Sequence, residues 1–125
     1  MQKFMEKETN SQIVRRYFDA YKTKNRAEVE LLLADGFTFA SPYDDAIDRA
    51  TYFERCWPNS EKRGENTLEQ VVAGGNNVFV TYLATTTEGA EFGNTEFFVL
   101  AGSQIASVDV YFGASYRDSA FQKQQ

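Results

Sequence analysis

The sequence predicts an α+β fold in which helices cover one face of a curved, mainly antiparallel sheet. Apolar residues recur at intervals of three and four in the first part of the 125-residue chain, and at every second position after about residue 66. The segments 74–77, 88–90 and 101–103 carry turn residues between the alternating stretches. Helices that precede a run of hairpin-connected strands are typical of the α+β class.

Each helix is expected from its own spacing and end signals. Residues 10–24 form an amphipathic helix whose apolar face is Ile13, Val14, Tyr17, Phe18 and Tyr21. Asn25 is placed to cap a second helix through Leu33, which Gly36 is expected to end. Asp48 is placed to cap a third helix over 49–57, and Pro58 is expected to stop it.

The strands are expected from alternation and turn chemistry. Residues 37–40 form a short strand, and the turn residues of 41–45 end it. Four further strands are expected over 68–73, 78–87, 92–100 and 104–112. The turn segments between these four strands predict three hairpins, and therefore an antiparallel meander.

Composition limits the classes of function. The length fits a single domain over residues 1–125, and 42% apolar residues with 15% aromatics are enough for a core and a cavity. The sequence has no histidine, which excludes Ser-His-Asp, Cys-His and His-metal sites. We therefore expect no metal and no cofactor.

The charge distribution and the lack of visible targeting signals limit the classes of expected binding partner. The net charge is −5, and no Lys or Arg lies between Gly64 and Tyr116. Because nucleic acids and phosphate-bearing cofactors require clustered cations, this half suits a neutral or cationic small molecule. Neither a signal peptide nor a membrane span is visible, and the single Cys56 cannot form an internal disulfide. We expect a cytoplasmic protein that binds neither nucleic acid nor membrane.

The order of elements and several short motifs together resemble the NTF2-like superfamily, in particular its SnoaL-like and ketosteroid-isomerase-like branch. The motifs are 13–17 in the first helix, 31–37 at the helix-to-strand junction, Ser41-Pro42, the hairpin 75–80 and the ending 105–113. The resemblance covers nearly the whole chain. It implies a cone-shaped sheet with a mostly apolar pocket at its open end, and a homodimer formed through the outer face of the sheet.

The resemblance also implies candidate catalytic residues. The tyrosine and the late-strand acid that donate hydrogen bonds to an oxyanion in isomerase-like members fall on Tyr17 and Glu96. The position of their catalytic base is Ser41, which cannot take a proton unaided, so Asp44 and Asp45 are the alternative bases. The acid of SnoaL-type cyclases would fall at Val108 or Val110.

Alternation in the strands and the aromatic content suggest how a pocket is lined. Glu96 shares strand parity with Phe98 and Leu100, so it points inward with a raised pKa if that face is the interior; otherwise it reaches solvent at the pocket mouth. Cys56 is expected to be a small buried hydrophobe. The remaining candidates line the pocket or pack in the core: Tyr21, Tyr43, Tyr52, Trp57, Tyr82, Phe98, Val110 and Phe112.

Two functional hypotheses remain open at this point. The first is an isomerase, dehydratase or cyclase that acts without a cofactor on a small, neutral, largely apolar compound. The second is a ligand-binding or dimerisation module that keeps the pocket and lacks a catalytic set. For a homodimer, the candidate contacts are the outward Thr81, Thr85 and Thr87 and the pair Asp109 and Tyr111.

Overall fold

The structure is a computed structural model that describes residues 8–122. Its helical elements are α1 (Asn10–Lys22), α2 (Arg26–Leu32), α3 (Arg49–Arg55) and the 3₁₀ helix η2 (Trp57–Lys62). Its strands are β1 (Leu33–Ser41), β2 (Asp44–Asp48), β3 (Arg63–Gly74), β4 (Asn77–Thr86), β5 (Ala90–Ala101), β6 (Gln104–Arg117) and β7 (Ala120–Gln122).

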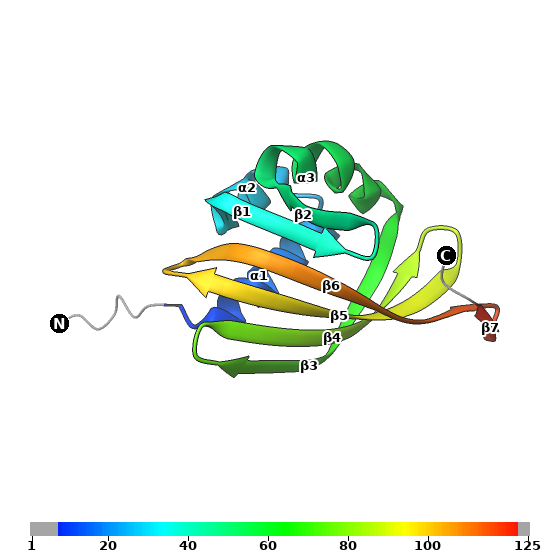
Figure 1. Ribbon diagram of the computed structural model, residues 1–125. Helices are drawn as coiled ribbons and strands as arrows, with labels where there is room; N and C mark the ends of the chain where they lie inside the picture. The colour runs from blue at the N-terminus through cyan, green and yellow to red at the C-terminus, as the bar shows by residue number, and fades with distance from the viewer. Residues whose placement is uncertain (1–7, 123–125) are drawn as a thin grey trace.

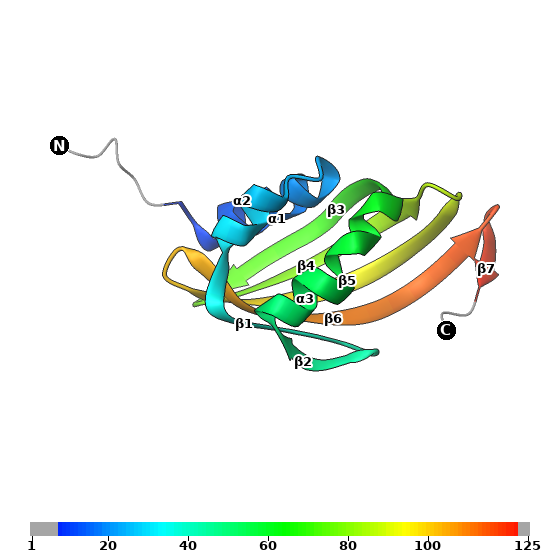
Figure 2. The ribbon, with the colours of Figure 1, turned by 90° about the horizontal axis from the view of Figure 1, so that it is seen from above.

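The strands form one curved sheet in the order β2-β1-β6-β5-β4-β3, with β7 paired to β6 (Figure 1). All pairs are antiparallel except β1 with β6, which is parallel. The helices α1, α2 and α3 lie over one face of this sheet (Figure 2). The expected α+β fold and the meander from β3 to β6 are therefore confirmed.

Helices α2 and α3 begin directly after the cap residues that the sequence predicts. The side chain of Asn25 accepts a hydrogen bond from Glu28 N, and that of Asp48 accepts one from Thr51 N. Thr9 caps α1 in a reciprocal box with Gln12. The apolar face of α1 packs with the inner face of the sheet into the core, as its spacing predicts.

The expected end of the second helix was wrong. The chain turns extended already at Leu33, and Gly36 lies within β1 instead of ending a helix. Leu33 and Phe37 are both buried, because β1 runs beside β6 with Leu33 opposite Ile105. The segment 41–45 is also not only a turn, since β2 begins at Asp44 and pairs with β1.

The region around Pro58 differs from the expectation as well. Helix α3 ends at Arg55, two residues before the expected Trp57, and Pro58 lies in the first turn of the 3₁₀ helix η2. Proline is tolerated there because a first-turn N–H has no helical partner to lose. Strand β3 then begins at Arg63, five residues earlier than expected, and this start brings a cation to the inner side of the sheet.

Two glycines accompany the bend of the sheet beside the polar part of β5. A Cβ at Gly113 would lie 2.6 Å from the carbonyl oxygen of Gly93, so only glycine allows this approach of the two strands. The register of β5 and β6 shifts between Phe92 and Asn94, as in a β-bulge. The bend sets Asn94 and Glu96 at the edge of the core.

Among residues 8–122, no helix combines the length and the apolar character needed to cross a membrane.

Candidate functional site

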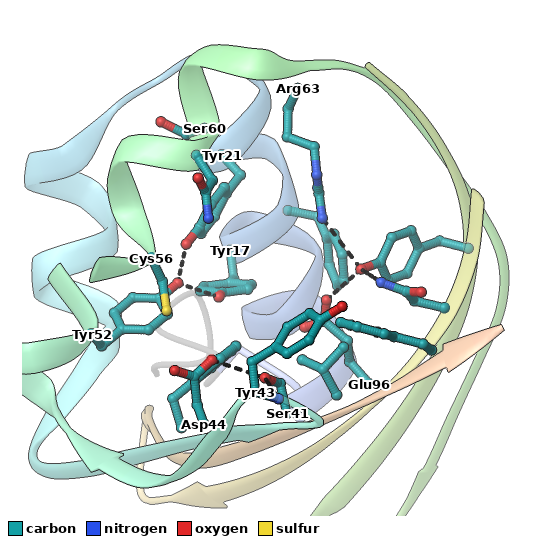
Figure 3. A pocket seen from close by; sticks show the side chains of 17 residues that line it. Tyr17, Tyr21, Ser41, Tyr43, Asp44, Tyr52, Cys56, Ser60, Arg63 and Glu96 are labelled. Carbon is teal, nitrogen blue, oxygen red and sulfur yellow. Dashed lines mark hydrogen bonds between the residues drawn. The ribbon is translucent and has the colours of Figure 1, made fainter. Parts of the chain in front are cut away.

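A cavity of about 270 Å³ lies between the helices and the inner face of the sheet. Figure 3 shows the side chains that line it. Residues from α1, β1, β2, α3, η2, β3, β4, β5 and β6 contribute to the lining. The lining residues are Tyr17, Phe18, Tyr21, Phe39, Ser41, Tyr43, Asp44, Tyr52, Cys56, Asn59, Ser60, Arg63, Tyr82, Asn94, Glu96, Val110 and Phe112.

Nine of the twelve candidate site residues lie in this lining. Three do not: Asp45 is exposed in β2, Trp57 packs its ring on Tyr21 with centroids 4.9 Å apart, and Phe98 is fully buried in the core. Asp45 does not line the cavity, whereas the neighbouring Asp44 is partly buried and does.

Glu96 belongs to a buried polar cluster centred on one phenol. The Tyr82 hydroxyl donates to Glu96 Oε2 at 2.6 Å. The Tyr82 hydroxyl oxygen accepts from Asn94 Nδ2 at 3.2 Å and from Arg63 Nη2 at 3.4 Å. Glu96 is only 6% exposed, so of the two positions open from sequence it takes the buried one. The cluster joins three strands, since Arg63 comes from β3, Tyr82 from β4 and the other two from β5.

Opposing effects set the pKa values in this cluster. Burial raises the pKa of the Glu96 carboxyl above its ordinary value of 4.5, whereas the Tyr82 hydrogen bond and the charge of Arg63 act to lower it. Burial acts to lower the pKa of Arg63, but nearby Tyr82 and Glu96 outweigh it and the net shift is upward. Burial also raises the pKa of Tyr82, so this phenol keeps its proton at physiological pH.

A second cluster consists of three tyrosines. The hydroxyl of Tyr52 lies 2.7 Å from that of Tyr17 and also hydrogen bonds to that of Tyr21. Burial raises the pKa of all three phenols, so each keeps its proton. Two hydrogen bonds use two of the three protons. One O–H donor therefore remains for a group in the cavity.

The third polar group lies in β1, β2 and the end of α3. Ser41 Oγ donates to Asp44 Oδ2 at 2.8 Å, and Arg55 Nη2 lies 2.9 Å from Asp44 Oδ1 without the alignment of a hydrogen bond. Figure 3 shows Ser41 and Asp44 at one side of the cavity and Arg63 at the other.

The Cys56 thiol also lines the cavity. Burial raises the pKa of this thiol to about 11, which makes it a poor nucleophile.

Sequence reasoning missed two members of the Glu96 cluster. Asn94 was within reach, because it lies two residues before Glu96 and so shares its strand face. Arg63 could not be found from the sequence, because the polar segment before residue 68 has no alternation that would predict a strand. In the described part of the chain, no three Cys, Asp or Glu side chains are grouped so that they would hold a metal ion.

Comparisons with known proteins place this geometry in a fold family. An NTF2-like protein of unknown function from Cytophaga hutchinsonii ATCC 33406 is 22% identical, with a TM-score of 0.73 over 87% of this chain and 94% of that one. A candidate ketosteroid isomerase from Kribbella flavida DSM 17836 is 21% identical, with a TM-score of 0.72 over 86% and 80% of the two chains. An M. tuberculosis LEH-like epoxide hydrolase is 16% identical, with a TM-score of 0.71 over 83% and 82%.

These similarities at low identity show the fold and confirm the resemblance to NTF2-like proteins. No curated protein sequence matches the chain. The SnoaL-like domain family matches residues 14–108, which is most of the chain. The protein therefore belongs to the SnoaL-like domain family.

Proposed function

We propose that the protein binds a small, neutral, mainly apolar molecule in the cavity beneath its helices. The observation that carries this proposal is the buried carboxyl of Glu96, which lines a cavity where half of the other lining residues are aromatic. Apolar walls with a few fixed polar groups are the usual composition of a small-molecule site. The rings supply the contact area and Glu96 fixes the polar end of the ligand.

Size and charge define the ligand further. A cavity of about 270 Å³ suits a compound of two fused rings or a monoterpene. The Glu96 and Arg63 charges oppose each other across Tyr82, so the wall as a whole favours an uncharged ligand. Binding of such a ligand also fits the absence of any Lys or Arg between Gly64 and Tyr116.

Catalysis without a cofactor is the second proposed function, and one observation favours it. The Glu96 carboxyl has a raised pKa and lies in the same cavity as the tyrosine cluster, which keeps one O–H donor unused. A carboxylate that takes a proton from carbon, together with a donor to the oxygen that becomes negative, is the minimum set for an isomerase or dehydratase. Glu96 would act as base and the tyrosine cluster as donor.

Thermal unfolding with a panel of neutral monoterpenes and bicyclic aromatics tests the binding proposal. A ligand at about one hundred times its Kd stabilises the fold by about 2.7 kcal/mol, which raises Tm by several degrees in a domain of this size. Val110→Phe places a ring in the cavity and should abolish the rise. Val99→Phe makes the same change on the outer face of the neighbouring strand and should keep it. Equal rises in both variants would refute a cavity site.

The proposal includes a homodimer formed through the outer face of the sheet. A row of apolar residues crosses three strands there, with Val72 opposite Phe79 and Phe79 opposite Phe97, and the charged Asp109 lies opposite Phe97 on the fourth strand. Val72 is 57% exposed and Phe79 48%. Exposed apolar residues that adjoin one another in this way are typical of a protein contact surface.

A further inference from the structure

We propose that the cavity selects its ligand by a hydrogen-bond donor: a neutral N–H or O–H group binds the free side-chain oxygens of Glu96 and Asn94. The inference rests on the proposed function, because it names the chemistry of the molecule that the cavity binds. It also assigns to Glu96 the role of acceptor toward the ligand, where the family resemblance implies a donor.

Two buried oxygens carry this inference. Glu96 Oε1 and Asn94 Oδ1 are buried, and no group within residues 8–122 forms a hydrogen bond with either. Their residues are only 6% and 7% exposed, they stand two positions apart on the inward face of β5, and both line the cavity. Because buried polar atoms are nearly always hydrogen bonded, the partner of these two oxygens is expected in the cavity.

The single hydroxyl proton of Tyr82 determines which side-chain atoms of Glu96 and Asn94 face the phenol oxygen. That proton goes to Glu96 Oε2, at 2.6 Å. The contacts of the phenol oxygen with Asn94 Nδ2 and Arg63 Nη2 must then be donated to it. Turning the Asn94 amide over would set Oδ1 against a phenol oxygen that has no proton left to give. Asn94 therefore keeps its NH₂ on Tyr82 and its oxygen free.

Arg63 supports the carboxylate form of Glu96. Its guanidinium is permanently charged, packs over the rings of Tyr82 and Phe92, and forms no ion pair with any carboxylate in the described chain. The nearest compensation for this charge is Glu96, across the Tyr82 hydroxyl that both contact. A carboxylate in that position has only lone pairs to offer at Oε1.

The same cation decides that the ligand's donor is neutral. An ammonium group at Glu96 would be buried beside the Arg63 guanidinium, and like charges repel strongly where water is excluded. A neutral N–H or O–H meets no such repulsion. It satisfies one or both free oxygens while the apolar remainder of the molecule contacts the aromatic wall.

Calorimetric titration with three bicyclic probes of nearly equal size tests the inference. Indole carries one N–H donor, 1-indanone carries only an acceptor, and indene carries neither. A hydrogen bond to a charged group contributes about 1.5–3 kcal/mol, so the wild-type protein should bind indole at least about tenfold more tightly than indene. 1-Indanone has no donor for Glu96, so Glu96 should not raise its affinity above that of indene.

Glu96→Gln should reverse the selectivity. The oxygen of the glutamine amide accepts from Tyr82 and its NH₂ takes the place of Oε1, so a donor replaces the acceptor. Indole then loses its advantage over indene, and 1-indanone gains affinity. The matched variant Glu91→Gln makes the same change on the exposed side of the same strand and should leave all three affinities within about twofold of wild type.

The outcomes separate this inference from the proposed function. If wild-type protein binds all three probes equally, or prefers 1-indanone, the donor preference is wrong while the cavity remains a binding site. If none of the three binds, both the inference and the proposed function fail. A tenfold preference for indole that persists in Glu96→Gln also overturns the inference, because the preference would then come from another group.

Discussion

Each face of the meander departs at a few positions from the usual distribution of polarity, and the two departures differ. On the inner face, β5 buries the amide of Asn94 and the carboxyl of Glu96. On the outer face, Val72, Phe79 and Tyr111 are about half exposed. A sheet that served stability alone would place these residues the other way round. This difference supports the proposals that the inner face binds the polar end of a small molecule and that the outer face contacts an apolar partner.

The largest expected effect is a difference in the free energy of unfolding between two phenylalanine-to-alanine variants. One phenylalanine lies in the core and the other on the outer face of the adjacent strand. Phe98 is fully buried against the rings of Tyr17 and Phe18, so Phe98→Ala should lower the free energy of unfolding by about 3–5 kcal/mol. Phe79→Ala, on the half-exposed outer face, should cost about 1 kcal/mol or less. Urea denaturation of both variants at one protein concentration measures the difference, and equal losses would contradict this assignment of the faces.

The outer face is tested next by introducing a charge. If the apolar row holds two copies together, Phe79→Glu buries a carboxylate in that contact and should weaken the dimer at least about tenfold. Sedimentation velocity over a range of concentrations measures the dissociation constant. Glu96→Gln, on the opposite face, should leave it unchanged. A wild-type protein that stays monomeric at tens of micromolar would rule out the dimer.

The reactivity of the Cys56 thiol tests a smaller expected effect, at the wall of the cavity. Because burial raises the pKa of its thiol to about 11, little thiolate is present at pH 8. Alkylation by iodoacetamide should be at least about tenfold slower than that of free cysteine, after allowing for the greater nucleophilicity of a more basic thiolate. Mass spectrometry over time measures the rate. Alkylation as fast as that of free cysteine would mean that this wall of the cavity is open to water.

The pH dependence of stability tests the environment of Glu96. Its pKa is raised in the folded protein, so between its ordinary value of 4.5 and the raised value the folded state binds the proton more strongly than the unfolded chain does. Wild type should therefore gain stability relative to Glu96→Gln as the pH falls from 7 toward 5, by no more than about 1.4 kcal/mol per pH unit. Urea denaturation at several pH values measures this difference, and a difference of opposite sign would show a lowered pKa.

Most of the fold could be predicted because its signals are local. Cap residues such as Asn25 and Asp48 bond to backbone groups three residues on, and strand alternation placed Glu96 on the face of Phe98. The errors occur where tertiary contacts decide. Gly36 lies in a strand because β6 pairs with β1, a contact between residues far apart in the sequence.

The candidate site was less predictable, because its hydrogen bonds also depend on tertiary contacts. Strand parity indicates that Glu96 points inward but not that Tyr82 donates to it, since that bond depends on the register of β4 and β5. Arg63 enters the cavity only because β3 starts early, in a polar segment without a periodic pattern. Trp57 and Phe98 do not line the cavity, because neither aromatic character nor strand parity with Glu96 distinguishes a cavity wall from the core.

The most direct test of the difference between the two faces is an NMR titration of ¹⁵N-labelled protein with indole. A ligand in the cavity should shift the side-chain amide of Asn94, the Nε–H of Arg63 and the backbone amides near Glu96. The amides of Val72, Phe79 and Tyr111 on the outer face should stay in place. Shifts confined to the outer face, or none at saturating indole, would contradict the assignment of the inner face as the binding site.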